Sequence, residues 1–147
     1  GSPQLDNKTL WVFANHLYVG GIWLKKQSKI SHFSSEENYS GTDKWDLGKD
    51  IKFSVAISGK PESSVRRDYF YLPALGQYKN GKLIDLGKKG YYWASTPNPV
   101  NNGPETAGYG NVISANCLRF GTDTELNNVY VRNYYERYVG MQVQAFE

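Results

Sequence analysis

The chain has 147 residues, of which 39% are hydrophobic and 21% charged, a composition typical of one globular domain rather than of a disordered segment. Its formal net charge is only +3 and its basic residues are scattered, which argues against a nucleic-acid-binding surface. No run of about 18 apolar residues is present to span a membrane, and the single Cys117 excludes an intrachain disulfide and a cysteine-based zinc cluster. Residues 1–3 are interpreted as a remnant of expression, with any signal or anchor removed.

Residues 9–24, TLWVFANHLYVGGIWL, are the most apolar stretch of the chain. Apolar side chains recur at the helical spacing of Leu10, Phe13 and Leu17, so we predict a short helix here. A strand is the alternative, because the same stretch is rich in aromatic and β-branched residues. The Gly20-Gly21 pair is expected to end either element.

The rest of the chain is predicted to form short strands in a single domain spanning residues 1–147. Alternating apolar and polar residues predict strands at 51–58, 68–72, 91–95, 116–120, 127–132 and 140–146. Asn80-Gly81 lies between short apolar groups and predicts a tight hairpin turn, since both residues tolerate positive φ. The polar residues 25–50 predict a surface excursion, and residues 97–113, with three prolines, a long exposed loop.

Strand alternation also predicts which aromatic residue anchors the core. In 91–95, YYWAS, it places Tyr91, Trp93 and Ser95 on one face of the strand and Tyr92 on the other. We expect Trp93 to be buried, because an indole of this size can fill a core once its N–H finds a partner.

Motifs for catalysis are absent from the sequence. His16 and His32 do not have the spacing of metal ligands, and there is no Gly-x-Ser-x-Gly elbow and no phosphate-binding glycine loop. Cys117 lies between small and apolar residues of a predicted strand, so we expect a buried free thiol rather than a nucleophile. We therefore predict a protein that is not an enzyme, with no catalytic residue, no metal site and no cofactor.

Residues 127–138, NNVYVRNYYERY, stand out because they hold four of the 12 tyrosines together with Asn and Arg. On a strand, Val129 and Val131 would face the core while Tyr130 and Arg132 face solvent. Exposed Tyr, Asn and Arg are typical of adaptable recognition surfaces; the alternatives are tyrosines packed on the flank of the domain and stacking of single-stranded nucleic acid. The predicted ligand-binding residues are Asn127, Asn128, Tyr130, Arg132, Asn133, Tyr134, Tyr135, Arg137 and Tyr138.

The second half of the chain resembles a known family. Its most specific parts are Leu72-Pro73-Ala74 and GYYWAST at 90–96, followed by NCLRF at 116–120 and an ending with Gly140 and Val143. These resemble the major paralogous domain of Fibrobacter and its relatives among Bacteroidetes surface and fimbria-associated proteins, over roughly residues 69–147. The sequence departs from the family pattern at Ala94, where Ser is usual, and at Gln144, where Arg is usual.

The resemblance implies a C-type-lectin-like fold, an α+β but β-dominated domain with short strands, long loops and few helices. This fold is similar to that of the variable proteins of diversity-generating retroelements, in which receptor contacts precede a terminal Gly-x-x-Val segment. It also implies a secreted, extracellular or cell-surface adhesion domain that binds a protein or glycan on a host or microbial surface. Nucleic acid and direct membrane insertion are not expected. The alternative is a pilin-like or scaffold domain that packs on other fimbrial subunits.

Overall fold

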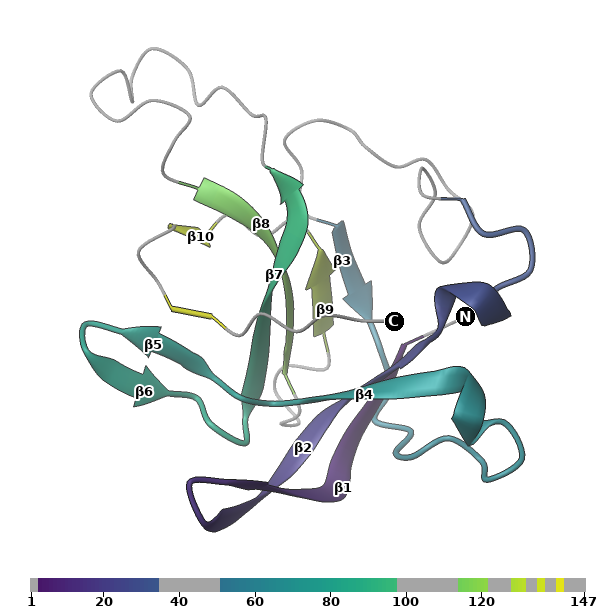
Figure 1. The fold of residues 1–147 in the computed structure, drawn as a ribbon, viewed down its shortest axis with the longest axis horizontal. Coiled ribbons are helices and arrows are strands. Elements are labelled where there is room, and N and C mark those ends of the chain that lie inside the picture. Colours follow the sequence, from purple (N-terminus) through teal and green to yellow (C-terminus); the bar gives the residue numbers. More distant parts are fainter. Residues whose placement is uncertain are drawn as a thin grey trace.

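The computed structural model describes residues 3–34, 51–97, 114–121, 128–131, 135–136 and 140–141. Within these ranges the fold is dominated by β-strands, as predicted (Figure 1). The helical residues described are the two 3-10 turns η1 (Gln27–Lys29) and η2 (Arg66–Asp68). Over the same part of the chain, no helix has the length and apolar character needed to cross a membrane.

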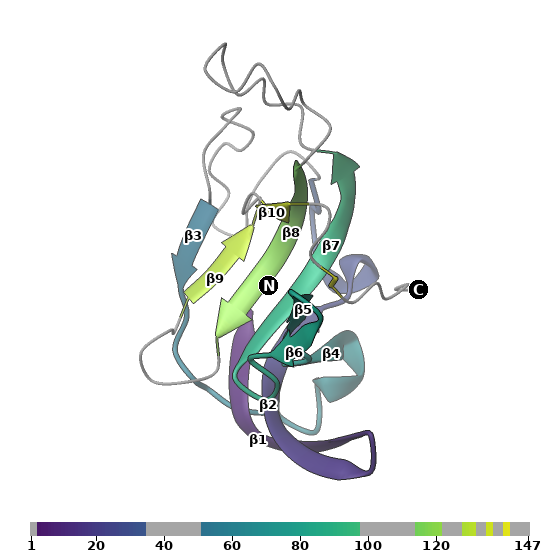
Figure 2. The same cartoon turned by 90° about the vertical axis from the view of Figure 1, so that its left-hand side faces the viewer.

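The strands form three antiparallel sheets. β1, β2 and β4 make a three-stranded sheet in that order, and β5 pairs with β6 in a separate hairpin. In the five-stranded sheet, β7 and β9 pair with opposite sides of β8, β3 lies beyond β9, and β10 pairs with β8 on the side of β9 (Figure 2). The strands are β1 (Gln4–Phe13), β2 (His16–Lys25), β3 (Ile51–Ser54), β4 (Tyr69–Pro73), β5 (Gln77–Lys79), β6 (Lys82–Ile84), β7 (Lys89–Pro97), β8 (Ser114–Gly121), β9 (Asn128–Val131) and β10 (Tyr135–Glu136).

The hydrophobic core draws on both large sheets. Its buried side chains come from β1, β2 and β4 of the three-stranded sheet and from β7, β8 and β9 of the five-stranded sheet: Leu5, Ile22, Leu72, Tyr92, Phe120 and Val129. Tyr92 stacks on Phe120 with ring centroids 6.2 Å apart, and its hydroxyl donates a hydrogen bond of 2.6 Å to the carbonyl of Pro73 on β4. Each such side chain stabilises the fold by roughly 1.5–3 kcal/mol through burial, so this shared core joins the two sheets.

The helix predicted within residues 9–24 is wrong. This segment is the end of β1, a two-residue turn at Ala14 and Asn15 with positive φ (47° and 63°), and β2. Gly20-Gly21 does not end the element, because both residues lie inside β2. At Gly21 an added Cβ would lie 2.4 Å from the ring of Tyr71. The glycine is therefore needed for close packing, and the aromatic and β-branched content outweighs the helical spacing.

The hairpin predicted at Asn80-Gly81 is confirmed. The two residues connect β5 to β6 with φ values of 52° and 72°, as the turn requires. The strands predicted at 68–72, 91–95, 116–120 and 127–132 correspond to β4, β7, β8 and β9, whereas the strand predicted at 51–58 is the shorter β3. Residues 35–50, the loop at 98–113 and the end of the chain after residue 141 lie outside the described residues.

The expected burial of Trp93 is wrong, and that of Cys117 is confirmed. Trp93 is only half-buried, while its neighbours Tyr91 and Tyr92 are 2% and 3% exposed. Trp93 pairs with Cys117 across β7 and β8, on the sheet face opposite to Tyr92. Of the three aromatic residues Tyr91, Tyr92 and Trp93, Tyr92 therefore is the one that belongs to the core between the two sheets. Cys117, the single cysteine of the sequence, has no exposed area.

Candidate functional site

The structure places Asn128, Tyr130 and Tyr135 of the predicted ligand-binding residues. Asn128 and Tyr130 are half-buried on β9, and Tyr135 lies in β10. Val129 is 1% exposed and contributes to the core, so the predicted alternation of an inward valine and an outward tyrosine is confirmed. The other predicted residues lie outside the described residues: Asn127, Arg132, Asn133, Tyr134, Arg137 and Tyr138.

Tyr130 belongs to a row of four side chains that crosses the outer face of the five-stranded sheet. Tyr91, Arg119, Tyr130 and Lys52 are successive register partners on β7, β8, β9 and β3. The guanidinium carbon of Arg119 lies 5.8 Å from the centroid of the Tyr91 ring and 5.2 Å from that of Tyr130. The Lys52 ammonium lies 5.7 Å from the Tyr130 ring. We call these four residues the cation–π row.

The cation–π row holds two positive charges in fixed places. A cation over an aromatic ring at this distance gains roughly 0.5–1 kcal/mol at an exposed site, and the guanidinium of Arg119 has a ring on each side. Within the described residues, neither Arg119 nor Lys52 forms an ion pair with a carboxylate. Lys52 is exposed and Arg119 is half-buried. The face can therefore offer charged hydrogen-bond donors, ordered by aromatic rings, to an acceptor-rich ligand.

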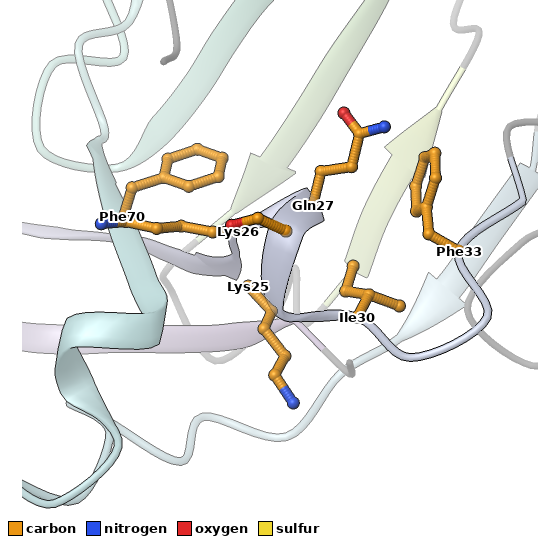
Figure 3. Close-up of a pocket in the computed structure, with 7 residues that line it drawn as sticks. Lys25, Lys26, Gln27, Ile30, Phe33 and Phe70 are labelled. Carbon is orange, nitrogen blue, oxygen red and sulfur yellow. The ribbon is translucent and has the colours of Figure 1, made fainter.

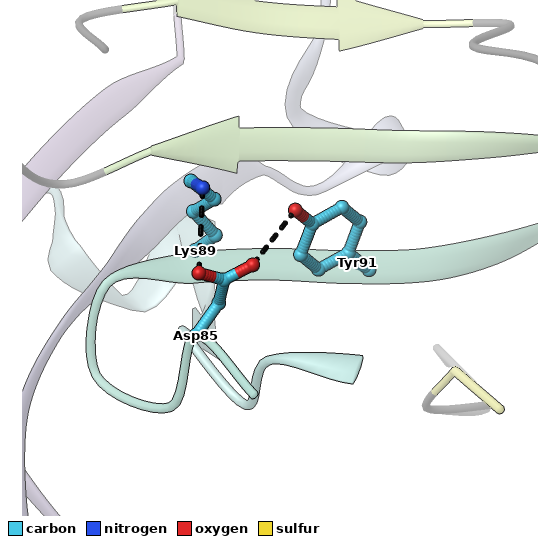
Figure 4. Close-up of polar contacts among 3 residues, drawn as sticks. All are labelled: Asp85, Lys89 and Tyr91. Atoms are coloured by element: carbon cyan, nitrogen blue, oxygen red, sulfur yellow. Dashed lines mark hydrogen bonds and ion pairs between the residues drawn. The ribbon is translucent and has the colours of Figure 1, made fainter. Parts of the chain in front are cut away.

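Asp85 fixes the buried end of this row (Figure 4). Its carboxylate accepts a hydrogen bond of 3.2 Å from the Tyr91 hydroxyl and pairs with the Lys89 ammonium at 3.3 Å. Asp85 has a φ of 61°, a conformation that aspartate tolerates better than most residues, and its carbonyl accepts the amide of Lys89. Because Tyr91 is buried, it supports the row rather than facing a ligand.

Lys52, Arg119 and the supporting Asp85 are not among the site residues predicted from the sequence. One signal for Arg119 was present, since Arg119 alternates with the apolar Leu118 and Phe120 in the predicted strand at 116–120. Its neighbours could not be identified in this way, because register between strands distant in sequence depends on the complete sheet.

The three-stranded sheet contains a buried charged group, Asp6. Burial opposes its ionisation, but hydrogen bonds from the Thr9 hydroxyl, the Trp23 indole and the amides of Lys8 and Thr9 outweigh this cost and hold the pKa of Asp6 below its ordinary value of 3.8. Burial, together with the nearby Asp6 carboxylate, raises the pKa of the Tyr71 hydroxyl. The hydrogen bonds to the Asp6 carboxylate stabilise the irregular part of β1 between Asp6 and Leu10. The role of Asp6 is therefore structural.

The described residues contain no group of three His, Cys, Asp or Glu side chains placed to hold a metal ion. In comparisons with known proteins, no family model, no curated protein and no solved structure matches the chain.

Proposed function

We propose that this chain is a non-catalytic, adhesin-like domain of a bacterial surface or fimbria-associated protein, and that it binds a protein or glycan outside the cell. The cation–π row is the observation that carries the proposal. It joins Tyr130, which the sequence predicted as a ligand contact, to the cations of Lys52 and Arg119 on neighbouring strands. Tyrosine and arginine are the residue types enriched at sites that dominate binding energy.

The proposed architecture is C-type-lectin-like, on the basis of the sequence resemblance over residues 69–147. Contacts between its two most specific motifs support this proposal. The Tyr92 hydroxyl of the second motif donates to the carbonyl of Pro73 in the first. Gly76, two residues after the first motif, forms an isolated bridge with Gly90. The motifs thus belong to one packed unit. In the variable proteins of similar fold, receptor contacts precede a terminal Gly-x-x-Val segment, and β9 likewise precedes Gly140 and Val143 in this sequence.

Glycan and protein arrays probed with the purified domain test this function, followed by affinity measurements on the ligand found. Arg119→Ala and Tyr130→Ala should each weaken binding about tenfold or more, because they remove an ordered cation or the ring that orders it. Tyr18→Ala is the matched control, since Tyr18 stacks on Trp11 in the other large sheet. Equal affinity in all three variants would contradict the assignment of the site.

The alternative function is a structural subunit that packs on its neighbours, and one observation favours it. Leu10 pairs with Val19 and Val12 pairs with Leu17 near the β1–β2 turn, so the four side chains share one face, where they are 43–69% exposed. We call these four residues the hairpin face. Apolar patches of this kind mark interaction sites. Sedimentation at rising protein concentration separates the two functions. Self-association that is lost in Leu17→Ser would favour the structural subunit.

A further inference from the structure

A groove lies at the end of β2 that is distant from its hairpin turn. Its volume is about 720 Å³. Its lining comes from the last residue of β2 and the residue after it, from η1 and the residues that follow it, and from β4: Lys25, Lys26, Gln27, Ser28, Ile30, Phe33 and Phe70. In Figure 3, Phe70 stands on one side and Phe33 on the other, with Gln27 and Ile30 between them. Phe33 is 47% exposed, so a large apolar ring faces an open space.

Among the described residues, cations outnumber carboxylates around the groove. Lys25 and Lys26 belong to the lining, and within the described residues neither forms an ion pair. Lys29 and Arg67 lie nearby and share one carboxylate, that of Asp68, at 3.8 Å and 4.0 Å. Since charges act over roughly 8–10 Å at physiological ionic strength, this excess of cations favours an anion at the rim.

We infer that the groove binds a small amphiphilic anion, with an aromatic or acyl body between Phe33 and Phe70 and a carboxylate or sulfonate at the lysine rim. The volume is within the range of ligand sites, about 300–1,000 Å³. The apolar side chains bury the aromatic or acyl body of the ligand, and the lysines favour a negatively charged head group. The site is separate from the cation–π row and does not depend on the proposed function.

Two fluorescent probes with the same aryl body test this inference. 8-Anilinonaphthalene-1-sulfonate carries the anion, and N-phenyl-1-naphthylamine lacks it. The sulfonate should bind at least about fivefold more tightly than the neutral probe, which is the scale of one partly exposed charge pair. Phe33→Ser should weaken both probes about tenfold, whereas Lys26→Gln should weaken the sulfonate alone.

Two control variants test whether the probes bind at surfaces other than the groove. Leu17→Ser removes part of the hairpin face, and Lys82→Gln removes an exposed cation on β6; neither should change the affinity for either probe. The inference is overturned if Leu17→Ser abolishes binding of the sulfonate, or if Phe33→Ser and Lys26→Gln leave it unchanged. Flotation with phosphatidylglycerol vesicles that depends on Phe33 would also overturn it, because the groove would then take a lipid surface and not a free amphiphile.

Discussion

At the scale of single residues, Asp6 shows how a buried charge is kept ionised by its neighbours. Its pKa is lowered in the folded chain, so the carboxylate contributes stability above its unfolded pKa, and that contribution is lost as the pH falls through the folded pKa. The hydrogen-bond donors are the two backbone amides, the Thr9 hydroxyl and the Trp23 indole. All four favour the charged form over the neutral one.

We expect Asp6→Asn to lower the free energy of unfolding by about 2 kcal/mol at pH 7, because its hydrogen bonds to a charged acceptor are replaced by weaker ones. The difference between the variant and the parent should shrink as the pH falls below the ordinary aspartate pKa of 3.8, because the unfolded parent then takes up a proton before the folded carboxylate does. Urea unfolding at several pH values measures this. A difference that does not change with pH would show that the charge of Asp6 contributes nothing.

At the scale of strands, close approach between neighbours decides which glycines can be replaced. An added Cβ on Gly21 would lie 2.4 Å from the Tyr71 ring and 2.5 Å from the carbonyl oxygen of Leu72, whereas nothing lies within 4 Å of one on Gly59. Gly21→Ala should therefore cost about 3 kcal/mol through overpacking. Gly59→Ala should cost only about 1 kcal/mol, from its φ of 78°. Thermal melting compares the stability of the two variants. Equal losses of stability in Gly21→Ala and Gly59→Ala would contradict the close packing at β2.

The two faces of β9 make a second comparison at this scale. Val129 is 1% exposed and lies in the core, while Tyr130 lies on the opposite face in the cation–π row. Val129→Ala should lower the free energy of unfolding by about 2 kcal/mol. Tyr130→Ala should lower it by less than about 1 kcal/mol, because it loses only partly exposed contacts. Denaturant unfolding tests both, and the reverse order would mean that the faces are inverted.

At the scale of the whole molecule, the two large sheets are joined by the core and by the hydrogen bond from Tyr92 to Pro73. Burial raises the pKa of Tyr92 above its ordinary value, so its hydroxyl remains protonated and can donate. Tyr92→Phe should cost about 1 kcal/mol, the usual net contribution of one such bond, while ring stacking on Phe120 is kept. Equilibrium unfolding measures the loss, with Tyr18→Phe as the control outside the core. No loss in Tyr92→Phe would show that the bond does not stabilise the junction.

The sequence by itself determined those features that depend on neighbours along the chain. The alternation in 127–132 assigned Val129 and Tyr130 to opposite faces, because side chains of a strand alternate, and Asn80-Gly81 specified its turn through tolerance of positive φ. Tertiary structure decided the rest. It made a hairpin of residues 9–24, where helical spacing and strand propensity disagreed, since pairing with β4 stabilises the strand. It also placed Arg119 and Lys52 beside Tyr130, because register between strands distant in sequence depends on the packing of the complete sheet.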